Sequence, residues 1–210
     1  MRKAFEIGGY VAAAVLIAFG LVAIVMGVNG RSTVNSSIKN EAIVGTPDMT
    51  PGGISAEASK AGLKNVTFPT CSMANKTVTN GTQARCFAEY MRIHTLMATG
   101  GQTYAQMPRY ATANGKGTND ATKALLANGQ PQSNPARDLW VTETALTTAL
   151  NTSYLASQIA LFGIVVGVAL LLSGIGFLIL ALGGALRSEN SVLFGKRTAE
   201  KPVSTTPVSA

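Results

Sequence analysis

The sequence predicts a mainly α-helical membrane protein that crosses the bilayer twice and holds a small, disulfide-tied cap of helices and loops outside it. Two uncharged apolar stretches, Ile7–Val28 and Ile159–Leu186, stand near the two ends of the chain. A long polar segment between them contains both cysteines and has no convincing alternating apolar run that would favour a sheet. We therefore divide the chain into a cytoplasmic N-terminus (1–6), a first span (7–28), an extracytoplasmic stalk and cap (29–158), a second span (159–186) and a disordered cytoplasmic tail (187–210).

Both apolar stretches are long enough to cross a bilayer as helices. Ile7–Val28 has 22 residues, which is about 33 Å of helix. Ile159–Leu186 has 28 residues and exceeds the hydrocarbon core, so that it must tilt or begin outside the membrane. The first stretch could instead be a cleaved signal peptide. Its apolar run is longer than a typical signal core and no A-x-A site follows it, which favours a retained span.

The positive charges near the spans predict the orientation. The loop carries eleven Lys and Arg over its whole length, whereas the two short ends together carry six. Long loops translocate largely regardless of their charge, and short cationic flanks stay in the cytoplasm. Both termini should therefore be cytoplasmic, and the loop should lie outside the plasma membrane.

Small residues recur four apart in both spans. The second contains Gly163 and Gly167, and the first contains Ala23 and Gly27. Such spacing lets the backbones of membrane helices approach closely. We expect these four residues to pack the two spans on each other; a dedicated homodimer contact is the alternative.

Both spans should continue outside the membrane as helical stalks. The first helix should run through Arg31–Val44 and end at Gly45, and the second should begin at Asn134-Pro135, as an N-cap followed by Pro at the first helical position. Apolar residues of the second stalk form one stripe, which we interpret as a packing seam: Leu139, Leu146, Leu150 and Tyr154.

The cap should contain short helices joined by turns. The predicted helices are Ser55–Leu63, with Ser55 as cap; Gln83–Thr99, ended by Gly100-Gly101; and Asp120–Ala127, capped by Asn119. Two segments, Val66–Phe68 and Thr77–Thr79, could form small strand pieces.

The only two cysteines, Cys71 and Cys86, both lie in the exported loop. In an oxidising compartment two such thiols usually pair, and we expect a disulfide that ties a loop to the start of the Gln83–Thr99 helix. Two free thiols or half of a metal site are the alternatives.

No residue pattern names a reaction. The formal charge of +7 is spread out and lacks the density and interleaved aromatics of a nucleic-acid patch. His94 is the only histidine, so we expect no metal, no cofactor and no catalytic residue. The residues best suited to a recognition surface are Arg92, His94, Tyr104, Arg109 and Tyr110, because Tyr and Arg favour protein contacts. Alternatively, the two tyrosines fold over the small core.

Three segments carry a resemblance to a known family. They are His94–Gly101 followed by Tyr104, Asn134–Tyr154 running into the second span, and Thr46–Pro51. In these segments the chain resembles an uncharacterised family of two-span membrane proteins from actinobacteria. The resemblance implies a bacterial envelope setting and no assigned activity.

These observations together favour a non-enzymatic plasma-membrane protein that serves as an accessory, scaffold or recognition subunit. Its expected partners are the lipid bilayer and either another membrane or envelope protein or further copies of itself. An extracytoplasmic sensor or ligand-binding module is the alternative, and a subunit of an envelope enzyme is a third.

Overall fold

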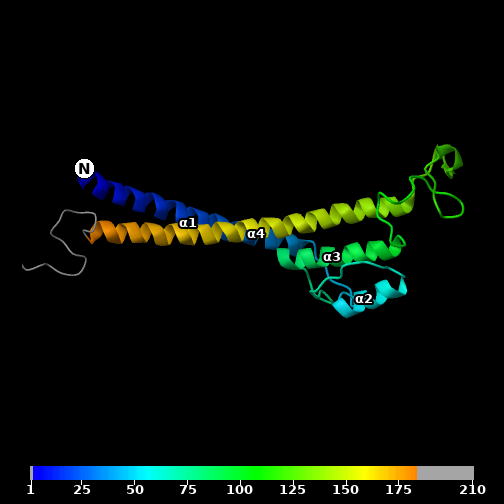
Figure 1. Ribbon diagram of the computed structural model, residues 1–210, viewed down its shortest axis with the longest axis horizontal. Helices are drawn as coiled ribbons and strands as arrows, with labels where there is room; N and C mark the ends of the chain where they lie inside the picture. Colours follow the sequence, from blue (N-terminus) through cyan, green and yellow to red (C-terminus); the bar gives the residue numbers. More distant parts are fainter. Residues whose placement is uncertain (1, 184–210) are drawn as a thin grey trace, which may run out of the picture. The chain divides into compact units, whose positions relative to one another are not determined.

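The computed structural model describes the backbone of residues 2–183 and the side chains of residues 5–183. It is mainly helical, as predicted, and two of its helices are long and apolar enough to cross a membrane (Figure 1). The elements are α1 (Arg2–Asn40), α2 (Pro51–Lys60), α3 (Gly81–Ala98), the 3-10 helix η1 (Ala121–Lys123), β1 (Leu126–Ala127), β2 (Gln130–Pro131) and α4 (Pro135–Leu182). The predicted end of the second span at Leu186 and the tail 187–210 lie outside the described residues.

The chain divides into two compact units, which are described separately. The first, here called the apolar unit, comprises Met1–Gly27 and Phe162–Ala210, and the second, here called the cap unit, comprises Val28–Leu161. Each long helix contributes to both units.

In the apolar unit, α1 and α4 run antiparallel in close contact. A Cβ added to Gly20 would lie 2.8 Å from the carbonyl oxygen of Gly167, and one added to Gly174 would lie 2.9 Å from the backbone nitrogen of Ile17. Since these distances exclude any side chain, the helices meet backbone to backbone at these points.

The buried residues of the apolar unit are all small. Among its described side chains, the buried ones are Gly9, Ala13, Gly20, Gly27, Gly167, Gly174 and Ala181. Most follow each other at seven-residue intervals, the repeat of a left-handed helix pair.

This spacing differs from the predicted spacing of four. Gly167 lies in the contact, but Gly163 does not need to be glycine, because the nearest atom to an added Cβ is the Ala23 carbonyl oxygen at 3.8 Å. Gly27 is buried, whereas Ala23 is only half-buried. The tight contacts recur every seven residues because Gly167 and Gly174, which are two helical turns apart, lie on the same side of α4.

The cap unit has a conventional core. Its fully buried large side chains are Tyr90, Ile54, Met73 and Val78, and the same cluster includes Ile93, Trp140 and Leu150. α2 packs against α3, and α3 lies alongside the first part of α4 (Figure 1). The unit therefore joins the two stalk segments to the cap through shared apolar side chains.

The predicted disulfide is confirmed. Cys71 and Cys86 are bonded with their Cα atoms 6.2 Å apart. Next to it, the Tyr90 hydroxyl donates a 2.6 Å hydrogen bond to the Cys71 carbonyl oxygen. The bond and the tyrosine together hold the loop before α3 against that helix.

The first helix ends earlier than predicted. α1 stops at Asn40, and Ala42 adopts a left-handed φ of 51°. Gly45 is not its C-terminal glycine. Instead its backbone passes directly against the Met73 carbonyl, where no side chain would fit, and its N–H donates to the Lys76 carbonyl oxygen at 3.0 Å.

Two cap helices exist with shifted starts. α2 begins at Pro51, not after Ser55, because the Thr50 side chain accepts a hydrogen bond from Gly53 N–H and Pro51 follows as the first helical residue. α3 begins at Gly81 for the same kind of reason, with Asn80 accepting from the Gln83 N–H at 3.0 Å.

The predicted helix Asp120–Ala127 is wrong. Only η1 forms there, capped by Asp120, and the chain then enters the antiparallel β1–β2 pair. Asn128 and Gly129 have φ values of 52° and 77°, which is the two-residue turn that Asn-Gly favours. The predicted strand pieces also fail: no strand forms at Val66–Phe68, and Thr77 makes only an isolated bridge to Val44.

Candidate functional site

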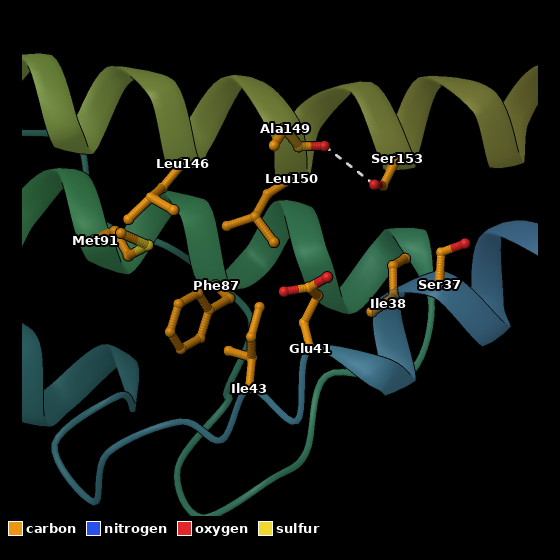
Figure 2. A pocket seen from close by; sticks show the side chains of 10 residues that line it. All are labelled: Ser37, Ile38, Glu41, Ile43, Phe87, Met91, Leu146, Ala149, Leu150 and Ser153. Carbon is orange, nitrogen blue, oxygen red and sulfur yellow. Dashed lines mark hydrogen bonds between the residues drawn. The ribbon is translucent and has the colours of Figure 1, made fainter.

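One concave feature of the cap unit is an apolar groove between three segments of the chain. It has a volume of about 560 Å³ and far more apolar than polar lining. Figure 2 shows its walls: Leu146, Ala149, Leu150 and Ser153 from α4, Phe87 and Met91 from α3, and Ser37, Ile38, Glu41 and Ile43 from the end of α1 and the chain after it. This volume and lining are typical of a binding site.

The groove exists because α1 ends before the apolar stripe of α4 does. From Leu150 toward the C-terminal end of α4, α1 covers this surface. Gly30 lies against Ala160, and Ile38 and Leu150 are both buried. Beyond Asn40 no helix continues along this track, and Leu146 is 49% exposed. The prediction that the stripe is a packing seam is thus correct at Leu150 and wrong at Leu146 and Leu139.

The α4 wall has the residue spacing of a helix-packing surface. Ala149, Leu150 and Ser153 lie three, four and seven residues after Leu146, which places all four on one side of the helix. Ser153 turns its hydroxyl back to the Ala149 carbonyl at 3.0 Å (Figure 2). Its polar group is thereby satisfied within the helix, and this end of the wall presents little more than small side chains.

One acidic side chain stands among these apolar groups. The Glu41 carboxylate extends toward the space between Leu150 and Phe87 (Figure 2). Among residues 5–183 no hydrogen bond or ion pair reaches it. The groove therefore offers one unpaired negative charge beside a large apolar surface.

A second apolar hollow of about 520 Å³ lies farther along α4. It is lined by Tyr104, Trp140, Val141, Thr144, Ala145 and Thr148. Trp140 is buried and donates its indole N–H to the Gln102 carbonyl oxygen at 2.8 Å. The exposed apolar surface of α4 thus extends over several turns.

The residues predicted as one recognition surface lie in separate environments. Arg92 stacks on the Trp140 ring with 5.3 Å between guanidinium carbon and ring centre, and Tyr104 stacks on Arg137 at 4.0 Å. His94 instead contacts Asp48 at 3.0 Å. Since Arg92 and His94 are two residues apart on α3, they point to different sides of the helix.

The remaining two predicted residues belong to the long loop before α4. The Arg109 side chain is exposed, and its backbone N–H donates to Asn119, which is therefore not a helix cap. Tyr110 forms backbone bridges to Thr118 and Ser133 and is half-buried. A recognition role for any of these residues stays a prediction.

One group of side chains has the donor atoms of a metal site. Asp48, Glu57 and His94 each present one such atom, and all three atoms lie within 4.8 Å of one another. The single histidine predicted no metal, but the fold brings two carboxylates beside it from a turn and a different helix.

Sequence reasoning missed the groove because its walls come from three separate segments. Phe87 and Met91 fall within the predicted Gln83–Thr99 helix, and Glu41 falls within the predicted first stalk, Arg31–Val44. The signal was the unequal length of the two stalks: α4 carries its apolar stripe to Leu139, past the point where Gly45 and Pro47 already excluded a long first stalk.

Tyr90 is a fully buried titratable side chain of the cap unit. Burial raises the pKa of its phenol above the ordinary value, and the negative charges of Glu89 and Asp48 add to the effect. The neutral phenol is the form that donates to the Cys71 carbonyl. The side chain therefore serves as a structural hydrogen-bond donor.

No protein family, curated protein or solved structure matches this chain. The groove and the Asp48, Glu57 and His94 group therefore have to be interpreted from their own chemistry.

Proposed function

We propose that this chain is an integral plasma-membrane protein whose apolar unit crosses the bilayer twice. The supporting observation is that its most apolar helical windows are only 17% buried within the chain. The core helix of a soluble protein would be mostly buried. Large side chains such as Phe19, Phe162 and Leu172 are instead 64–68% exposed, and water would oppose such a surface whereas lipid would solvate it.

We infer that both termini are cytoplasmic and that the cap unit lies outside. The disulfide supports this side, because such bonds persist in oxidising compartments and are rare in the cytosol. The cationic ends of the chain support the same orientation. An actinobacterial envelope setting, implied by the family resemblance, agrees with both arguments.

Within this setting, we propose that the cap unit is a non-enzymatic recognition subunit whose groove receives a helix of another membrane or envelope protein. The observation that carries this is the end of α1 at Asn40, beside an α4 surface that continues apolar. A helix in this groove would extend the track of α1 and pack on Leu146 and Ala149 through ridges and grooves.

Two features favour a helix over other occupants. The small residues Ala149 and Ser153, four apart, permit close backbone approach, as in helix pairs. The unpaired Glu41 carboxylate favours a segment that carries Lys or Arg beside its apolar face. A lipid chain or a second copy of this protein would not need both features.

Photo-cross-linking tests this proposal. A photoreactive benzoylphenylalanine at Leu146 should yield one discrete adduct in native membranes, and the cross-linked peptide should come from a helical segment of a different membrane protein. Ala149→Trp in the same chain should abolish the adduct by filling the groove.

The matched control places the same probe at Leu126, which is 65% exposed on β1 and does not line the groove. It should give no such adduct. Lipid adducts alone, adducts to a second copy of the chain, or identical products from both positions would contradict the proposal.

A further inference from the structure

The geometry points to a binding site for a divalent transition-metal ion, with zinc as the first choice, made by Asp48, Glu57 and His94. This site is independent of the groove and of any partner helix. Its residues come from three segments: the turn before α2, α2 itself, and the middle of α3.

The first argument is an unusual pair of buried polar atoms. His94 Nε2 and Asp48 Oδ2 are 3.0 Å apart, and both atoms are buried and without a hydrogen bond. They therefore meet at contact distance without the geometry of a hydrogen bond. Buried polar atoms nearly always have partners. A cation shared between the two would satisfy both atoms, as would a proton that makes them an ion pair.

The second argument is the distance. Zinc binds nitrogen and carboxylate oxygen at about 2.0–2.2 Å, which places two donors on one ion about 3–3.5 Å apart. The Nε2 to Oδ2 separation agrees with a shared ion. Glu57 supplies a third donor within 4.8 Å of both, and because its side chain is exposed it can rotate to close on the ion.

The third argument is that Asp48 is held in place before any ion arrives. The Thr50 N–H donates to the Asp48 carbonyl oxygen at 2.6 Å. A Cβ added to Gly53 would lie 2.5 Å from that same oxygen, so this glycine lets the chain fold tightly around it. The turn that carries Asp48 is thus tightly held, whereas the Glu57 side chain is exposed.

The donor set decides the class of ion. Calcium and magnesium prefer oxygen donors alone, whereas an imidazole with carboxylates suits zinc and its divalent transition-metal neighbours. With three protein donors the ion would retain positions for water. Bound there, it would link α2 and the preceding turn to α3, as the disulfide links the loop before α3 to that helix.

Calorimetric titration of the full-length, tag-free, chelator-stripped protein in mild detergent with zinc chloride tests the inference. We expect one zinc ion per chain. Glu57→Gln should weaken binding at least about tenfold, and it should leave the fold intact because the side chain is exposed. The matched control, Glu89→Gln, removes an acidic residue of α3 that pairs with Arg85 and should bind as the unchanged protein does.

A second measurement identifies the histidine. Cobalt(II) added to the same protein should give visible ligand-field absorption that His94→Asn abolishes. The absence of stoichiometric zinc binding, equal affinity in Glu57→Gln and Glu89→Gln, or a cobalt spectrum that survives His94→Asn would overturn the site. Equal affinity in particular would leave Asp48 and His94 as a simple ion pair.

Discussion

The two units of this chain place large and small apolar residues in opposite positions. In the described part of the apolar unit, every buried residue is Gly or Ala, while large side chains such as Phe19 and Phe162 face outward. In the cap unit the large side chains Tyr90, Ile54 and Met73 are buried. Both long helices, α1 and α4, take part in both arrangements.

The contrast supports the proposal that the two units face different solvents, lipid around the apolar unit and water around the cap unit. Burying large apolar side chains stabilises a fold only where water is the alternative. In lipid that driving force between helices vanishes, and close backbone packing through small residues replaces it. The same kind of substitution should therefore have different effects in the two units.

Truncation of an isoleucine should give the largest difference. Ile54→Ala in the cap core should lower the free energy of unfolding by about 2–5 kcal/mol. Ile7→Ala, at a position 62% exposed in the apolar unit, should change it by less than about 0.5 kcal/mol. Denaturant titration followed by the fluorescence of Trp140, the only tryptophan, and by circular dichroism in detergent measures both. Equal losses would break the comparison.

Removal of the disulfide should affect the cap unit alone. Cys71→Ser with Cys86→Ser opens a loop of sequence separation 15 and should cost about 3 kcal/mol. The same Trp140 titration measures this loss. The helix contact between Gly20 and Gly167 should survive, as judged by an engineered cross-link between α1 and α4, and loss of that contact would show that the units are not independent.

A methyl group added to Gly167 should weaken the packing of the two helices of the apolar unit, whereas one added to Gly163 should not. Gly167→Ala should destabilise the helix pair by about 1–3 kcal/mol, because its Cβ would meet the Gly20 carbonyl oxygen at 2.8 Å. Gly163→Ala, with 3.8 Å to its nearest neighbour, is the matched control and should be neutral. Titration of helicity with a denaturing detergent ranks the two. A larger loss of stability in Gly163→Ala than in Gly167→Ala would contradict the seven-residue contact and favour the predicted spacing of four.

Alkaline pH should produce the smallest effect, confined to the cap unit. Because the pKa of Tyr90 is raised in the folded protein, its contribution to stability is complete below the pKa of an unfolded tyrosine, about 10. That contribution is lost as pH rises through the raised value. The unfolding midpoint should fall above pH 10, and less steeply in Tyr90→Phe. If the unfolding midpoints of the unchanged protein and of Tyr90→Phe fell equally steeply with pH, Tyr90 would not be the cause of the loss.

Much of this architecture could be predicted because its signals are local. The lengths of the two apolar runs predicted both long helices, and Asn134-Pro135 predicted the start of α4. The presence of only two cysteines predicted that they pair with each other. The Asn128-Gly129 turn is also a local signal, but Asn119 as a helix cap favoured a helix over Asp120–Ala127 instead.

The sites could not be predicted because their parts meet only in three dimensions. Glu41 borders the groove because α1 ends at Asn40, which depends on how Gly45 passes the Met73 carbonyl. Asp48 reaches His94 because a turn places it there. A residue spacing along one helix carries no information about such neighbours.

Cysteine labelling in intact cells tests the central claim, that the outward apolar surface is covered by lipid and the cap is outside. Val165 and Leu126 are 59% and 65% exposed in the isolated chain, so that only a membrane would distinguish them. A membrane-impermeant maleimide should label Leu126→Cys and leave Val165→Cys unlabelled. Equal labelling of the two positions, or labelling of Val165→Cys alone, would contradict the account.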